Sequence, residues 1–228
     1  MFSLPNHGST CYMNSAIQFL YSSPTFVQLT SEYSGDCEFT KLLKDPKTNI
    51  KQIIEKFPQF RIGEPHDSQE ALLAIIDVLE KSLDKELFYG KTTTKYISKT
   101  ESTETNGEYG MLMFNPRGDS DLETLFEQSE KMEYITNQDG FVCTKIAHTS
   151  FPKILICMFW NRRNIKLPET FQGKTLRSVI VHMGHEMAGH YVAVCKRDDE
   201  WYFTNDEQIE KIENMPTNIC PYLALYSD

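Results

Sequence analysis

The period of the hydrophobic pattern changes along the chain, from helical spacing in the first part to strand alternation in the last third. Before Tyr89, apolar side chains recur at helical spacing over residues 11–21, 50–57 and 72–83. The strand-like segments of the last third are residues 153–160, 178–183, 191–196, 201–204 and 222–226. A helical part followed by an antiparallel β part predicts an α+β fold with two lobes, and a site belongs in the cleft between the lobes.

The middle of the chain has a different character. Residues 91–110 are rich in Thr, Ser, Glu and Gly and have no apolar period. This segment predicts either an exposed hairpin or a mobile insertion. A short helix is expected over residues 121–131.

Length, charge and cysteine usage narrow the class of protein. The 228 residues suffice for one domain, and the net charge of −9 argues against a nucleic-acid binder, which needs a basic face. No run of about 18 apolar residues occurs, so we expect no membrane span, and the N-terminus does not resemble a signal peptide. The six cysteines lie far apart without any C-x-x-C pair. This predicts reduced thiols in an intracellular protein of the cytoplasm or nucleus, not a disulfide scaffold or a zinc ribbon.

Cys11 is the first candidate for catalysis, because it stands where the first predicted helix begins. The exposed N–H groups and the macrodipole of a helix start favour a thiolate, and Ser9 or Thr10 is placed to cap the helix. Asn6 lies upstream across Gly8, so its amide can reach back and donate to an oxyanion formed beside the Cys11 sulfur. The alternative is a buried structural cysteine, which is the commoner role of a free cysteine.

His190 is the candidate base among the six histidines. It stands at the start of the predicted strand 191–196, which we expect to form a hairpin with the strand 201–204. In that hairpin the imidazole lies opposite the stretch from Asn205 to Glu207. Directly paired side chains have Cβ atoms about 5 Å apart, so Asn205 or Asp206 can hold the ring and fix its tautomer. The alternative is a packed histidine at a strand end, and such a structural role is what we expect of His182.

Asp67 and Glu70 precede the third predicted helix. Asp at the N-cap and Glu three residues later form a capping box, which contributes roughly 1 kcal/mol. This structural role is the simplest account of the pair. It is compatible with a further role at the rim of a cleft, because a capped helix start can also be exposed.

Four segments resemble motifs of one known family, the ubiquitin-specific proteases. The segment NHGSTCYMNS at residues 6–15 resembles the cysteine box of that family. Residues 189–206, with GHY followed by a Trp and FTND, resemble its histidine box, and GHEMAG at residues 184–189 is similar to its substrate-gated blocking loop. DSQE at residues 67–70 resembles a third block, in which two acids bind the arginine-bearing tail of ubiquitin.

The resemblance implies a single domain over residues 1–228 with a papain-like α+β fold. A helical thumb is expected over residues 1–89, and an antiparallel β palm with shortened fingers over residues 90–228. The implied activity is that of a deubiquitinating cysteine protease, which hydrolyses the isopeptide or peptide bond after the ubiquitin C-terminus through a thioester. The implied site residues are Cys11, His190 and Asn205 as the triad, Asn6 as the oxyanion donor, Asp206 as an auxiliary residue, and Asp67, Glu70, Gly189 and Tyr191 as the residues that bind the ubiquitin tail.

The chain departs from the family in two places. FWNR at residues 159–162 replaces the usual Leu-Lys-Arg-Phe after the palm strand, and the two zinc-binding C-x-x-C pairs of the fingers are absent. We therefore expect no structural metal, no cofactor and shortened fingers. Two alternatives stay open, namely a protease for a ubiquitin-like modifier and a non-catalytic ubiquitin-binding module of the same fold. The sequence does not predict the oligomeric state.

Overall fold

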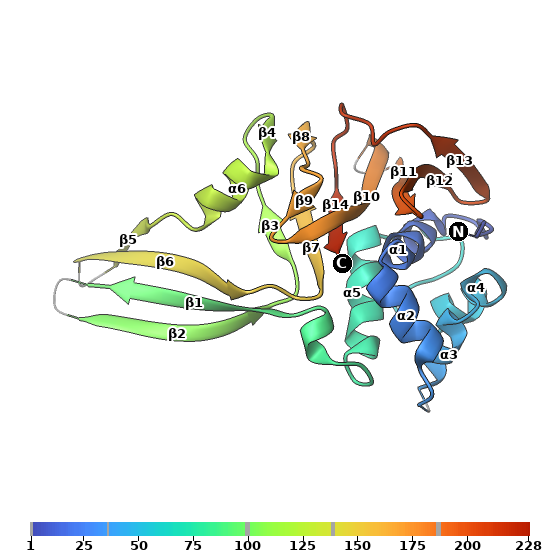
Figure 1. The fold of residues 1–228 in the computed structure, drawn as a ribbon, viewed down its shortest axis with the longest axis horizontal. Coiled ribbons are helices and arrows are strands. Elements are labelled where there is room, and N and C mark those ends of the chain that lie inside the picture. Colours follow the sequence, from blue (N-terminus) through green and yellow to red (C-terminus); the bar gives the residue numbers. More distant parts are fainter. Residues whose placement is uncertain (1, 36, 99–100, 138–139, 186–187) are drawn as a thin grey trace.

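The chain folds into a group of helices, a central sheet and a projecting four-stranded arm (Figure 1). The computed structural model describes residues 2–35, 37–98, 101–137, 140–185 and 188–228. The helices that form the thumb are α1 (Cys11–Tyr21), α2 (Pro24–Glu32), α3 (Glu38–Leu43), α4 (Pro46–Glu55) and α5 (Ser68–Leu79), followed by the short 3-10 helix η1 (Lys85–Leu87). Helices and antiparallel sheets are both present, as the change of hydrophobic period predicts.

The palm is a largely antiparallel sheet with the strand order β13-β12-β11-β10-β14-β7-β3. Its strands are β3 (Leu112–Phe114), β7 (Ile154–Phe159), β10 (Lys174–His185), β11 (Ala188–Arg197), β12 (Glu200–Asn205), β13 (Gln208–Ile212) and β14 (Leu223–Ser227), and β9 (Thr170–Phe171) pairs with β10. The strand β3 runs parallel to β7, whereas the other pairs are antiparallel. All five strands predicted for the last third are present.

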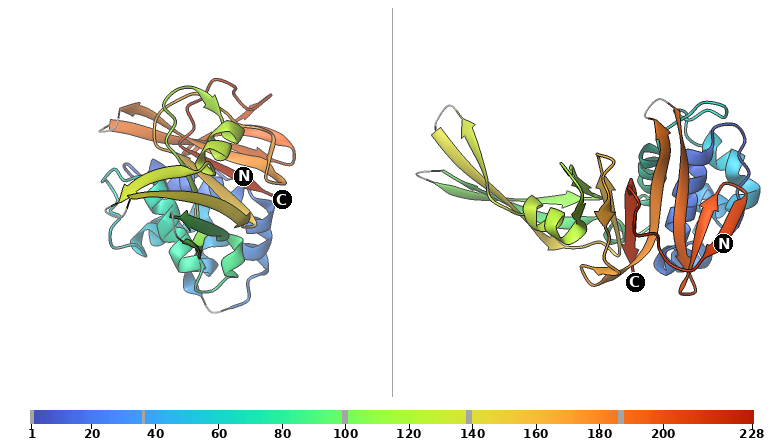
Figure 2. Two further views of the ribbon diagram at one scale, coloured as in Figure 1. Left: turned by 90° about the vertical axis from the view of Figure 1, so that its left-hand side faces the viewer. Right: turned by 90° about the horizontal axis from the view of Figure 1, so that it is seen from above.

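The arm is a second, antiparallel sheet with the strand order β2-β1-β6-β5, and it projects away from the rest of the molecule (Figures 1 and 2). Its strands are β1 (Gly90–Ile97), β2 (Ser102–Tyr109), β5 (Glu133–Asn137) and β6 (Gly140–Ser150). Of the two possibilities for residues 91–110, the hairpin is therefore confirmed. Most residues of β2 are exposed, so the strand ladder and cross-strand pairs hold the arm, such as Lys95 with Glu104 at 3.1 Å.

Between the two hairpins of the arm, the chain returns to the palm. It forms β4 (Ser120–Asp121) and α6 (Leu122–Ser129), and β4 pairs in parallel with β8 (Ile165–Lys166). The helix α6 begins where Asp121 caps it, through a bond from the N–H of Thr124 to the carboxylate at 2.7 Å. The predicted helix over residues 121–131 is thus confirmed, with a shorter C-terminal end.

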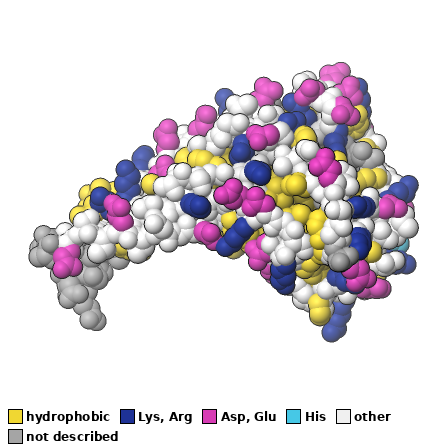
Figure 3. All heavy atoms as spheres, turned by 60° about the horizontal axis from the view of Figure 1, so that its bottom comes forward, with side chains coloured by type: hydrophobic (Ala, Val, Ile, Leu, Met, Phe, Trp, Pro, Cys, Tyr) yellow, Lys and Arg dark blue, Asp and Glu magenta, His cyan; other side chains and the backbone are white. Residues whose placement is uncertain are grey.

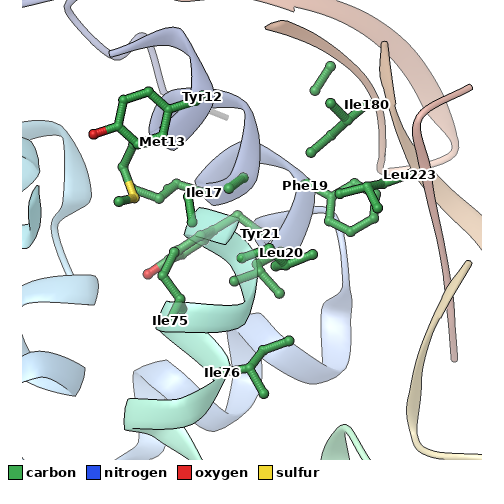
Figure 4. Packing of buried hydrophobic residues seen from close by; sticks show 14 of the residues in the cluster. Tyr12, Met13, Ile17, Phe19, Leu20, Tyr21, Ile75, Ile76, Ile180 and Leu223 are labelled. Atoms are coloured by element: carbon green, nitrogen blue, oxygen red, sulfur yellow. The ribbon is translucent and has the colours of Figure 1, made fainter. Parts of the chain in front are cut away.

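The main hydrophobic core lies between the helices and one face of the palm sheet (Figure 4). All residues of α1 are buried, because this helix packs between α5 and the strands β10 and β11. Phe19 of α1 points toward the strands that carry Ile180 and Leu223. On the side of α1 that faces α5 lie Ile75 and Ile76. A second cluster, which includes α6, covers the opposite face of the palm. This packing holds α1 rigidly against the sheet, so the residues at its start have a fixed position relative to β11.

Acidic and basic side chains are interspersed on the molecular face shown in Figure 3, with apolar side chains scattered among them. This face carries no continuous basic surface of the kind that nucleic acid requires. Among the described residues, no helix has the length and apolar composition that a membrane crossing demands.

Candidate active site

Cys11 is the first residue of α1, and its side chain lines a cavity of about 570 Å³ between thumb and palm. Burial raises the pKa of the Cys11 thiol, and the carboxylate of Asp206 raises it further, whereas backbone groups of Tyr191 and Tyr12 lower it. Burial is the largest of these effects, so the helix start alone does not produce the thiolate that its position favours. The surroundings of Cys11 therefore disfavour the thiolate form.

Thr10 occupies the N-cap position of α1, but its side chain makes no capping bond to the helix. Its hydroxyl instead accepts from the N–H of His7 at 3.0 Å. The turn between these residues is tight, because Gly8 and Ser9 adopt left-handed φ angles of 87° and 54°. The expectation that Ser9 or Thr10 caps the helix through a side chain is wrong, since the hydroxyl of Thr10 closes the turn.

Asn6 lines the same cavity as Cys11, and its side-chain amide is held at both ends. Oδ1 accepts from the N–H groups of Gly8 at 3.0 Å and Thr10 at 3.2 Å. Nδ2 donates to Oδ2 of Asp206 at 2.7 Å. Nδ2 carries two hydrogens and uses only one of them on Asp206, so the other is able to donate into the cavity.

His190 lies on β11 and also lines this cavity. Its Nε2 lies 2.6 Å from Oδ1 of Asn205, the last residue of β12. An amide oxygen only accepts, so Nε2 carries the hydrogen when the ring is neutral, and Nδ1 keeps a lone pair that can accept a proton. The ladder pairs Ala193 with Thr204, and β12 ends soon afterwards, so Asn205 reaches His190 from the end of its strand as the hairpin predicts.

Asp206 leaves the strand with a left-handed φ of 52° and joins three parts of the chain. Its Oδ1 accepts from Nδ2 of Asn14 at 2.8 Å, and its backbone oxygen accepts from the N–H of Leu4 at 3.2 Å. Its Oδ2, which accepts from Asn6, lies 3.9 Å from Nε2 of His190. Asp206 therefore positions Asn6 directly, while its contact with His190 is longer than that of Asn205.

Asn14 is a site residue for which the sequence reasoning gave no role. It is only 2% exposed, and besides Asp206 its Nδ2 contacts the backbone oxygens of Leu4 and Pro5 at 3.4 and 3.3 Å. A signal was present in the sequence, because a polar amide at a buried position of an apolar helix needs partners.

Asp67 caps α5 and also binds the palm. Its Oδ1 accepts from the N–H of Gln69 at 2.6 Å and from the hydroxyl of Tyr222 at 2.7 Å, and its Oδ2 accepts from the hydroxyl of Tyr191 at 2.7 Å. The N-cap role is confirmed. Among the hydrogen bonds of the described residues, none runs from the Asp67 N–H to the Glu70 carboxylate, so the second half of the expected capping box is not seen. Glu70 instead lines the cavity that contains Cys11.

A second cavity of about 350 Å³ adjoins the first, and the two share Asp67, His182 and Tyr191 as lining residues. His182 stacks on Tyr191 with a centroid separation of 4.5 Å. The structural role expected of His182 stays a prediction, and the structure adds that the side chain lies at the junction of both cavities. Gly189 lines the first cavity, and of the blocking-loop segment residues 186–187 lie outside the described part of the chain.

The cysteines are all free thiols, in line with the reduced state that their spacing predicts. Cys157 and Cys195 are buried core residues with a raised pKa, because burial disfavours the thiolate. Within the described ranges, no group of three or more His, Cys, Asp or Glu side chains is arranged to hold a metal ion.

Comparison with known proteins identifies the family and the relatives that this chain matches. The chain matches the family described as "Ubiquitin carboxyl-terminal hydrolase" over residues 2–226. It is also similar to Ubiquitin carboxyl-terminal hydrolase 5 of Schizosaccharomyces pombe, with 24% identity over 273 residues. That match covers 91% of the chain but 25% of the relative, so the chain spans about a quarter of the curated relative's length.

Solved structures show the same fold. A SAGA DUB module of Ubp8, Sgf11, Sus1 and Sgf73 bound to monoubiquitin contains a chain with a TM-score of 0.90 and 16% identity, covering 100% of this chain and 69% of that one. The corresponding module bound to ubiquitin aldehyde gives a TM-score of 0.86 at 17% identity, with the same coverage of 100% and 69%. These likenesses confirm the predicted fold class, because the whole chain superimposes on it.

Proposed function

Because the chain belongs to the ubiquitin carboxyl-terminal hydrolase family, we propose that it is a deubiquitinating cysteine protease that cleaves the bond after the C-terminus of ubiquitin. The observation that carries this proposal is the cavity lined jointly by Cys11, His190 and Asn6, with His190 bonded to Asn205. A nucleophile, a base with a fixed tautomer and an amide donor are the three groups that acyl transfer by a thiol requires.

The proposed reaction uses these three groups in sequence. Nδ1 of His190 accepts the Cys11 proton, and the sulfur attacks the carbonyl carbon of the scissile bond. The oxyanion that forms accepts a hydrogen bond from Nδ2 of Asn6. The imidazolium returns its proton to the departing amine, which leaves a thioester on Cys11, and water hydrolyses this thioester with His190 again as base.

The surroundings of the Cys11 thiol fit this sequence of steps. Burial and the Asp206 carboxylate both raise the pKa of the thiol, which disfavours a free thiolate, so in this mechanism the imidazole takes the proton as the sulfur attacks. Asn205 holds the ring through an uncharged acceptor, which fixes its orientation and stabilises the imidazolium less than a carboxylate would.

Ubiquitin-propargylamide tests the proposal, because it forms a covalent adduct only with an aligned nucleophile. We expect wild-type protein to form one adduct and Cys11→Ala to form none while retaining ubiquitin binding. Cys220→Ala is the matched control, since Cys220 is also a free thiol but is exposed and lies outside the Cys11 cavity. Adduct formation by Cys11→Ala would refute the assignment.

A panel of probes separates the alternatives. Reaction with a probe made from a ubiquitin-like modifier, and not with the ubiquitin probe, would identify a protease for that modifier. Binding of ubiquitin without any adduct would identify a non-catalytic module. The free thiols also support the proposal that the protein acts inside the cell, in the cytoplasm or nucleus. A fluorescent fusion seen only in the secretory pathway would contradict that placement.

A further inference from the structure

The two cavities are consecutive stretches of one groove. The inner cavity contains Cys11, the outer one is lined by Trp160 and Arg162, and the two meet at Asp67, His182 and Tyr191. Tyr191 and Asp67 are bonded to each other from opposite lobes. An extended peptide that passes from the outer cavity to Cys11 must therefore cross the position of these three side chains.

His182 fills the space over the backbone at this crossing. Its ring stacks on Tyr191 with an interplanar angle of 29°. A Cβ atom added to Gly189 would overlap Nε2 of His182, so the ring lies directly against the Gly189 backbone. Glycine is required here by the close approach of the ring, and a peptide following the groove needs the same space.

Arg162 holds the His182 ring in this position. One guanidinium nitrogen contacts Nδ1 of His182, and another donates to the backbone oxygen of Gly184. A guanidinium has no acceptor, so Nδ1 must accept and the ring is neutral with its hydrogen on Nε2. Burial and then the Arg162 charge lower the pKa of His182, whereas Asp67 opposes this shift and His190 adds to it.

We propose that Arg162 is a positioning residue that controls access to the nucleophile, because it latches His182 across the groove that a C-terminal tail must follow. The identity of the tail rests on the proposed function, whereas the contacts of Arg162 with His182 and Gly184 do not. Arg162 lies in the FWNR segment where the sequence departs from its family. The latch is therefore a property of this chain's own residues.

Removal of the Arg162–His182 contact should increase the rate at which a ubiquitin probe labels Cys11. The tail passes only when the ring swings away, so the observed rate is the intrinsic rate multiplied by the open fraction. A hydrogen bond to a charged group shifts such an equilibrium about tenfold or more when buried, and less at a partly exposed site, so we expect about a fivefold gain for Arg162→Ala.

Rates of labelling by ubiquitin-propargylamide and by iodoacetamide form the first test. Ubiquitin must thread its tail through the groove, whereas the small iodoacetamide reaches the inner cavity directly. For Arg162→Ala we expect faster ubiquitin labelling and unchanged alkylation. Arg163→Ala is the matched control, because it removes the same charge from an exposed neighbour that lines neither cavity, and it should match wild type.

A double-mutant cycle of Arg162→Ala and His182→Ala tests whether Arg162 acts through His182. His182→Ala should accelerate ubiquitin labelling at least as much as Arg162→Ala, and adding Arg162→Ala to it should change nothing further. Slower or unchanged ubiquitin labelling of Arg162→Ala would overturn the latch. An equal gain with iodoacetamide would also overturn it, because the thiol itself would then have changed.

Histidine NMR separates failure of the latch from failure of the proposed function. In ¹⁵N-histidine-labelled protein, with His182 assigned through His182→Gln, Arg162→Ala should raise the pKa of His182 toward its ordinary value. If the pKa of His182 is the same in the wild type and in Arg162→Ala, the proposed latch is wrong. If the ubiquitin probe labels no variant, the proposed function fails, and the NMR titration still decides whether Arg162 holds His182.

Discussion

Oδ1 of Asn205 lies 2.6 Å from Nε2 of His190, so the amide and not the adjacent carboxylate is the nearest partner of the imidazole. The carboxylate of Asp206 bonds to Asn6 and Asn14 and lies 3.9 Å from the same nitrogen. Two neighbouring residues thus serve two different groups of the site. In the proposed mechanism, Asn205 orients the base, and Asp206 orients the oxyanion donor.

Asn205→Ala should lower kcat about a hundredfold, because the imidazole loses the acceptor that fixes its tautomer and general-base catalysis contributes at least this much. Asn205→Asp keeps an acceptor at the same place and should recover most of the activity. The measurement is kcat for a ubiquitin fluorogenic substrate. Wild-type activity in Asn205→Ala would remove this residue from the triad and leave Asp206 as the orienter of His190.

Asn6→Ala and Asp206→Ala should each lower kcat by about 10²- to 10³-fold, as the loss of one oxyanion donor does. Because Asp206 acts by holding Asn6, the double mutant should be little worse than the poorer single mutant. Asp206→Asn should not restore the activity lost in Asp206→Ala. Asn6 and Asn14 donate to different oxygens of Asp206, and in the asparagine one of these is replaced by an NH2 group that cannot accept. Additive losses in the Asn6–Asp206 cycle would show that the two residues act independently.

The pH dependence of thiol alkylation follows from the charge near Cys11. Burial and the Asp206 carboxylate raise the pKa of the thiol, so alkylation by iodoacetamide should rise at a higher pH than for an ordinary exposed cysteine. Asp206→Asn removes a negative charge that disfavours the thiolate. The pH at which the alkylation rate rises should therefore be lower in this variant than in the wild type. A shift to higher pH in this variant would show that Asp206 stabilises the thiolate instead.

Tyr222→Phe should lower the free energy of unfolding by about 1–2 kcal/mol, because Asp67 loses a hydroxyl donor between palm and thumb. Burial and the Asp67 charge raise the pKa of Tyr222, which keeps this hydroxyl protonated as a donor. Tyr202→Phe is the control, since its hydroxyl bonds to the exposed Glu200, and it should change stability little. Urea unfolding measures both variants, and equal effects would contradict a special role for Asp67.

Chelators should leave the melting temperature and the activity unchanged. The arm lacks C-x-x-C pairs, and its hairpins are held by strand ladders and cross-strand pairs. The measurement is thermal unfolding before and after treatment with 1,10-phenanthroline, together with the metal content of the purified protein. A stoichiometric amount of zinc, lost together with stability on chelation, would prove the expectation wrong.

Local patterns predicted the parts of the fold that local interactions determine. The helix expected over residues 11–21 is observed with those bounds, because its apolar spacing and its preceding turn both lie within a short segment. The neighbourhood of His190 and Asn205 was also predictable, since a hairpin brings together residues that are close in the sequence. By contrast, α2 and α3 were missed, because α2 buries only Phe26 and Thr30 and α3 has only six residues, so neither gives a long apolar period.

Contacts between distant segments could not be predicted from the sequence. The bond from Tyr222 to Asp67 and the contact of Arg162 with His182 depend on how the lobes and loops pack, and no spacing rule connects these residues. The second hairpin of the arm was missed as well. Its strand β6 pairs with β1 of the first hairpin, so the register of β6 depends on a strand that is distant in the sequence.

The bond between Asn6 and Asp206 joins residues 200 positions apart, and this has a consequence for the order of folding. Each hairpin of the arm pairs near neighbours, such as Ile97 with Ser102, and closes at small entropic cost. A contact of very long range forms late, and during synthesis it must wait until the strands near the C-terminal end have left the ribosome. We therefore expect the nascent thumb to carry an inert Cys11, which becomes competent only when the segments that carry His190 and Asp206 have packed against the thumb.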